Sequence, residues 1–102
     1  MYRYTTPTIP ITIDTVDFAE VDFFRIAIRK SGVNWIFTFS PDDDNVDDES
    51  HTIFLSLTQE QTAELTDGMA QIQVRIKFKS GSVQATNIAK VSIKDVLDEV
   101  II

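Results

Sequence analysis

The stretch MAQIQVRIKFK, residues 69–79, alternates between apolar and polar side chains from Ala70 onward. A two-residue period is the pattern of a β-strand that buries one face in a core and turns the other to water. The core-facing set is Ala70, Ile72, Val74, Ile76 and Phe78, and the water-facing set is Gln71, Gln73, Arg75, Lys77 and Lys79. One long strand with a single buried face is therefore the first prediction.

The same period recurs elsewhere, so further strands are expected. They are predicted around Ile9–Ile13 and over residues 21–30, 33–39, 52–57, 82–86 and 87–93. The inward sets include Phe24, Ile26 and Ile28; Val33, Trp35, Phe37 and Phe39; and Ile53, Leu55 and Leu57. Pro10 cannot donate to a strand ladder, which makes the first strand an edge strand. Tight turns are predicted at Ser31-Gly32 and Ser80-Gly81.

Two segments depart from this alternation. Thr58 and Gln61 fit a capping box, with one or two helical turns expected over residues 62–66 and an end at Asp67-Gly68. The final stretch KDVLDEVII is apolar at five positions and is predicted to form either a last helical turn or a short strand.

About seven one-faced strands with short connections, in a chain of 102 residues, predict a single all-β domain over residues 1–102. The expected architecture is an immunoglobulin-like antiparallel β-sandwich with one short helical turn, and the alternative is a small β-barrel. Trp35 is expected in the core, at a place where such sandwiches often keep a buried Trp.

The charge balance excludes several classes of partner. The net charge is −7, and six of the sixteen acidic residues lie between Asp42 and Glu49, so the rest of the chain is almost neutral. The sequence has no clustered excess of Lys and Arg, so nucleic-acid binding is not predicted. No apolar run is long enough to span a membrane and no secretion signal is visible, so a cytoplasmic product, or one that leaves the cell by lysis, is expected.

The acidic stretch SPDDDNVDDES, residues 40–50, raises the question of a calcium site. An EF-hand loop that began at Asp43 would have Asp48 where glycine is required and Phe54 where glutamate is required, so the pattern fails. A looser calcium site would use Asp43, Asn45 and Asp47. The favoured interpretation is a solvated loop, because like charges repel, and a contact surface for a basic partner is a further alternative.

Nothing in the chain predicts catalysis or a cofactor. With no cysteine, thiolate metal sites, disulfides and cysteine nucleophiles are excluded. Ser50 and His51 are neighbours, so on a strand they point to opposite faces and do not pair as nucleophile and base. The three glycines form no phosphate-binding pattern. A non-enzymatic protein is expected.

Apolar residues outside the predicted core point to protein–protein contact instead. Phe23, Ile36 and Phe54 fall on outward faces, and the tail ends in Val100, Ile101 and Ile102. Clustered exposed apolar groups mark interfaces. The alternative is that a loop, the C-terminal tail or the second face of the sheet covers these residues within the same molecule. An alternative function is carbohydrate or cell-surface binding, for which Tyr2, Tyr4 and Trp35 are the stacking candidates.

Several motifs resemble small proteins encoded by phages and prophages of Gram-positive bacteria. They are Thr5-Thr6-Pro7-Thr8 at the first strand, Leu57-Thr58 with Glu60 and Thr62, Gln73 with Arg75, Gly81, Val91-Ser92 and Val96-Leu97. The resemblance covers most of the chain and implies a structural or accessory protein of a virion gene cassette, whose partners are other phage structural proteins or a second copy of itself. The motifs carry no catalytic residue.

Overall fold

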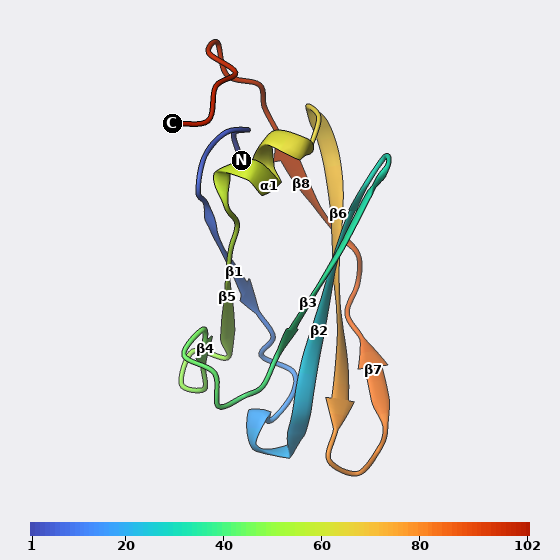
Figure 1. Cartoon of the computed structure of the whole chain (residues 1–102). Coiled ribbons are helices and arrows are strands. Elements are labelled where there is room, and N and C mark those ends of the chain that lie inside the picture. The colour runs from blue at the N-terminus through green and yellow to red at the C-terminus, as the bar shows by residue number, and fades with distance from the viewer.

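The computed structural model describes all 102 residues and has two antiparallel sheets that pack face to face (Figure 1). The first has the order β1-β5-β4, with β1 Thr8–Thr12, β5 Thr52–Ser56 and β4 Val46–Asp47. The second has the order β3-β2-β6, with β7 and β8 both paired to β6. Its strands are β2 Val21–Lys30, β3 Val33–Phe39, β6 Gly68–Phe78, β7 Val83–Ala85 and β8 Ala89–Ile93. The predicted all-β sandwich is confirmed, with eight strands.

The strand order is that of the immunoglobulin sandwich. In immunoglobulin letters, β1, β5 and β4 take the places of strands B, E and D, and β3, β2 and β6 take those of C′, C and F. β7 and β8 share the place of strand G, because they pair with different ends of the same edge of β6. No strand takes the place of strand A beside β1, which is an edge strand as Pro10 predicted.

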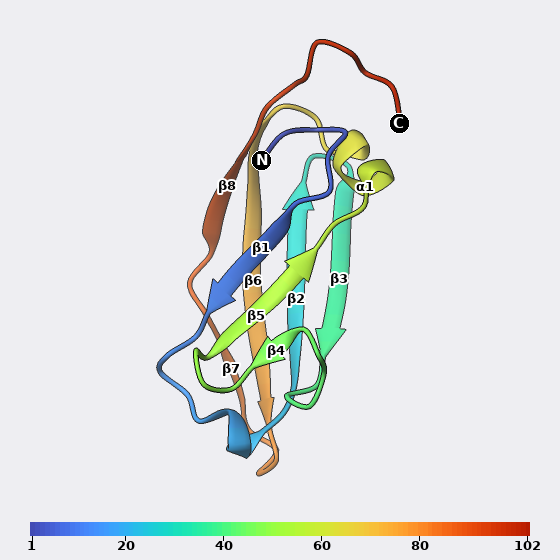
Figure 2. The same cartoon turned by 90° about the vertical axis from the view of Figure 1, so that its left-hand side faces the viewer.

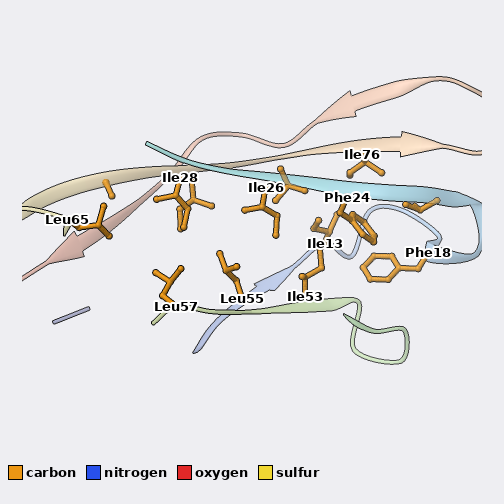
Figure 3. Close-up of a cluster of buried hydrophobic side chains, with 14 of the residues drawn as sticks. Ile13, Phe18, Phe24, Ile26, Ile28, Ile53, Leu55, Leu57, Leu65 and Ile76 are labelled. Atoms are coloured by element: carbon orange, nitrogen blue, oxygen red, sulfur yellow. The ribbon is translucent and has the colours of Figure 1, made fainter. Parts of the chain in front are cut away.

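The core lies between the sheets and consists of the inward side chains of the alternating strands (Figure 3). Phe24, Ile26 and Ile28 of β2 are fully buried, and they face Ile53 and Leu55 of β5. The predicted inward sets of β2, β5 and β6 are confirmed. Trp35, which was expected to be buried, is only half-buried, because β3 is the edge strand of its sheet.

A β-bulge changes the face that β2 presents. The register between β2 and β6 shifts between Val21 and Phe23, so Val21 is buried while Phe23 turns to the outer face. Residues two positions apart on a regular strand share a face, so the bulge is the reason that Val21 and Phe23 point to opposite faces.

The helical segments are short. The Thr58–Gln61 capping box is present in both directions, and it opens α1 Gln59–Glu64, so the helix starts three residues earlier than the predicted turns. Leu65 follows and is fully buried. A 3₁₀ turn, η1 Phe18–Glu20, leads into β2. Neither helix is long enough to cross a membrane.

Two other expectations need correction. The acidic stretch is not a loop throughout, because Val46–Asp47 forms β4 against β5. The tail after β8 forms neither a helical turn nor a strand, and it crosses the end of the sandwich near α1 (Figure 1). Its residues lack a partner strand, so the apolar composition alone was not enough to give it regular structure.

Adjacent residues of β5 give a test of this packing. Leu55 is 1% exposed and Phe54 is 38% exposed. We expect Leu55→Ala to lower the free energy of unfolding by about 2–5 kcal/mol, because it leaves a cavity in the core. Phe54→Ala should cost less than half as much, as measured by chemical denaturation with both variants at one pH. Equal costs would contradict the assigned faces of β5.

Candidate functional site

The outer face of the larger sheet carries an unusual set of charges. Because β2, β6 and β8 alternate in register, their outward positions hold five of the nine basic residues of the chain. We call this surface the basic face: Arg25, Arg29, Arg75, Lys77 and Lys90. None of the five makes an ion pair, since the only ion pairs join Arg3 to Asp95 and Glu99. None has a side-chain hydrogen bond either, and all five charges are left to solvent or to a partner.

Arg25 and Arg75 form the centre of the basic face. They are direct cross-strand partners on β2 and β6, where like charges destabilise a sheet. An acid on an adjacent strand would relieve this repulsion, but the neighbours are Thr38 on β3 and Ala85 on β7. The arrangement is therefore unfavourable for the isolated domain and suited to an anionic ligand.

A hollow of about 240 Å³ surrounds this pair, and it is lined by Phe23, Arg25, Arg75, Lys77 and Val83. Three cations and two apolar side chains thus meet in one concavity. Two further hollows lie toward the other end of the same face, and both are lined by Arg29, Asn34 and Gln71. Hollows therefore lie toward both ends of the outer face.

Sequence reasoning missed the basic face. Arg75 and Lys77 were predicted to point to water, but the charges outside the acidic stretch were only summed, and in that sum they nearly cancel. The missing information was the register between β2 and β6, which brings residues 50 positions apart in the chain directly opposite each other. The basic face could have been predicted from the sequence, because the segments of β2 and β6 both carry bases at their polar alternating positions.

The predicted interface residues do not form one patch. Phe23 and Ile36 lie on the outer face of the larger sheet, where Phe23 is half-buried and Ile36 is 41% exposed. Phe54 lies on the outer face of the other sheet, paired with Pro10 of β1. Val100, Ile101 and Ile102 lie in the tail at the end of the sandwich (Figure 2). Only the first two residues belong with the basic face.

Polar contacts hold the tail over α1. The Gln59 side-chain amide donates to the Ile102 carbonyl, and the Ile102 N–H donates to the Gln59 amide oxygen, each at 2.8 Å. Arg3 contacts Asp95 at 2.8 Å and Glu99 at 3.6 Å. These exposed contacts leave Leu97 and Ile102 almost fully exposed.

The acidic stretch is organised by hydrogen bonds within itself. Asp43 accepts from the Ser40 backbone N–H at 2.8 Å, and the Asn45 side chain donates to the Phe54 carbonyl at 3.3 Å. The carboxylate of Asp47 accepts from the Ser50 hydroxyl at 2.8 Å and from the Glu49 backbone N–H at 3.1 Å. No three His, Cys, Asp or Glu side chains converge as metal ligands.

The remaining candidates lie apart from one another. The His51 ring packs at a tilt against Phe18, with ring centroids 5.1 Å apart, while the hydroxyl of Ser50 donates to Asp47. Tyr2 lies beside the end of β8, and Trp35 lies on β3 at the other edge of the same sheet. Tyr2, Tyr4 and Trp35 therefore form no shared stacking platform for a sugar ring.

Comparison of the chain with known protein families finds no family model that matches, and comparison with curated proteins finds no match. The assignment of a site therefore rests on the geometry of the basic face.

The hydrogen bonds of Asp47 give a prediction about its ionisation. The Ser50 hydroxyl, and after it the Glu49 backbone N–H, lower the pKa of Asp47 from its ordinary value. Since the pKa is lower in the folded state, the ionised carboxylate stabilises the fold above the ordinary Asp pKa, and this contribution is lost as the pH falls through the folded-state value. Ser50→Ala should raise the pKa of Asp47, as followed by NMR titration. Ser40→Ala should leave it in place, and an equal shift in both variants would contradict this assignment.

The Arg25–Arg75 repulsion can be tested by reversing one charge. Arg75→Glu places an acid opposite Arg25, and we expect the free energy of unfolding to rise by about 0.2–1 kcal/mol at low salt. The gain should shrink as salt screens the exposed pair. Thr15→Glu serves as the control, because it adds an acid in an exposed loop, where no cross-strand cation lies opposite it. A loss of stability in Arg75→Glu would show that the two arginines do not repel.

Proposed function

We propose that this chain is a non-enzymatic binding protein that docks an acidic surface of another protein on its basic face. The observation that carries the proposal is the cross-strand pair Arg25–Arg75, which has no acid beside it. A domain that keeps two facing arginines unpaired carries a cost that a bound carboxylate would remove, because charge-assisted hydrogen bonds to arginine are strong.

The apolar groups on this face favour a protein ligand over a nucleic acid. Phe23 and Val83 line the same hollow as the arginines, and Ile36 lies exposed on the neighbouring strand β3. Apolar residues combined with arginine are typical of protein interfaces. A nucleic acid also binds through a large excess of bases, which this chain lacks.

The biological setting that we propose is a phage or prophage, in which the protein is a structural or accessory component. Support comes from the resemblance of Thr5–Thr8, of Leu57-Thr58 with Glu60 and Thr62, and of Val91-Ser92 to small proteins of such cassettes. An immunoglobulin-like sandwich suits this role, because its rigid sheets present broad faces for docking.

Mass spectrometry of particles purified after induction of the prophage in the source strain tests this function. We expect the wild-type chain in stoichiometric amount with the capsid and tail proteins. A folded Arg25→Glu/Arg75→Glu double variant, verified by circular dichroism and melting temperature, should be lost from the particles, because its face would repel an acidic partner.

A Thr8→Glu/Thr15→Glu variant adds acids away from the basic face and should be incorporated like the wild type. Absence of the wild-type chain from particles would refute the virion role. Normal incorporation of the double arginine variant would instead refute the basic face as the docking surface, so the two parts of the proposal fail separately.

A further inference from the structure

A second surface lies on the open side of the sandwich, between the free edge of β1 and the β7–β8 edge. It is a hollow of about 310 Å³ with a mostly apolar lining, which we call the A-strand groove. Its residues are Ile9–Thr12, Ile72, Val74, Thr86, Asn87, Ala89 and Val91. Figure 2 shows β7 and β8 on the same side of the molecule as the outer edge of β1. The volume is at the low end of the range for ligand pockets, which suits a few side chains.

The burial of the lining residues shows that the groove lacks a covering element. Ala89 is the register partner of the buried Ile72 and points inward like it, yet Ala89 is exposed. Ile9, Ile11 and Val91 also point inward and are only half-buried. Inward residues of a sandwich are normally covered by the second sheet, so this part of the core is open to solvent.

The groove is the place that strand A occupies in a complete immunoglobulin sandwich, and this chain fills only its upper end. The Met1 amino group donates to the Ser92 carbonyl, and the Lys94 N–H donates to the Met1 carbonyl, each at 2.8 Å. The Arg3 N–H donates to the Lys94 carbonyl at 2.9 Å, and Tyr2 forms a parallel bridge with Lys94. The pairing reaches Ser92 and Lys94, and the earlier residues of β8, from Ala89 to Val91, have no partner on this edge.

Backbone groups for a further strand are present on β8. Ser92 and Lys94 bond away from β6, so by the alternation of a strand ladder Lys90 also directs its backbone groups to the free edge. The edge of β1 on the other side of the groove has fewer hydrogen-bond donors for a new strand, because Pro10 has no N–H. A strand that enters the groove would therefore pair with β8 and pack its side chains against β1.

The tail of the chain has the properties that such a strand requires. Leu97, Val100, Ile101 and Ile102 are 109%, 55%, 44% and 95% exposed. Valine and isoleucine favour strands, and on a strand Val100 and Ile102 share one face, which matches the apolar lining of the groove. A segment of seven residues spans about 23 Å as a strand, which exceeds the length of β1.

We propose that residues 96–102 of a second copy of this chain give up their Gln59–Ile102 hydrogen bonds, enter the A-strand groove and add a strand to β8. The chain's own tail is not the occupant, because it leaves β8 at the end that Met1–Arg3 already cover and turns toward α1. The contact is heterologous, because the tail of one copy meets the groove of another. An open chain of copies would therefore have a free tail at one end and a free groove at the other, whereas two copies that exchange tails would form a closed dimer. This inference is independent of the basic face.

A complementation experiment tests it by sedimentation velocity. The full chain should associate as its concentration rises, from the monomer mass of 11.5 kDa. A chain that ends at Asp95 keeps its groove and loses its tail, and Ala89→Glu keeps its tail and places a charge in the groove. Each should stay monomeric alone, and their mixture should form a one-to-one pair that grows no further.

Ala19→Glu, a matched change at an exposed residue of η1, should associate like the wild type. Melting temperatures verify that every variant is folded. A full chain that stays monomeric up to about 1 mM, a weak affinity for proteins, would overturn the proposal. So would association of the chain that ends at Asp95 with itself, or failure of two folded monomeric variants to pair when mixed.

Discussion

The pairing of β2 with β6 is the interaction on which the rest of the structure depends. These two strands are the longest in the molecule and lie at the centre of the larger sheet. Their inward residues form most of the buried core, and β3, β7 and β8 all attach to one of them. Each strand therefore holds an apolar face against the smaller sheet and a polar face toward solvent, and any change of register would exchange the two faces.

The same register creates the candidate site. Buried residues such as Ile26 and Val74 require one alignment of β2 on β6, and that alignment places Arg25 opposite Arg75. Core packing is worth several kilocalories per mole for each large side chain, whereas a cross-strand repulsion costs less than about 1 kcal/mol. The core therefore determines the register, and the charge pair persists as a local cost that a ligand can remove.

The sequence was informative wherever a strand has one clearly apolar face. The alternation in residues 69–79 predicted the correct faces of β6, and the capping box at Thr58 is confirmed, although α1 starts three residues before the predicted turns. Features that depend on contacts between distant segments were missed, namely the basic face and the open groove. β4 was missed too, because its two residues are too few to show an alternating pattern. The tail was wrongly expected to be regular: its composition suits a strand, but within its own molecule it turns toward α1 and pairs with no strand edge.

The separation of β2 from β6 in the chain also has a kinetic consequence. The β2–β3 hairpin is joined by only Ser31 and Gly32, and such hairpins form in microseconds. The β2–β6 ladder must close a long loop first, so it is expected to form on the slower time scale of β-sandwiches. Until then one edge of β2 is unpaired and open to association with other chains. Arg25 and Arg29 lie along that strand, so the charges that burden the folded sheet protect the newly made chain from aggregation.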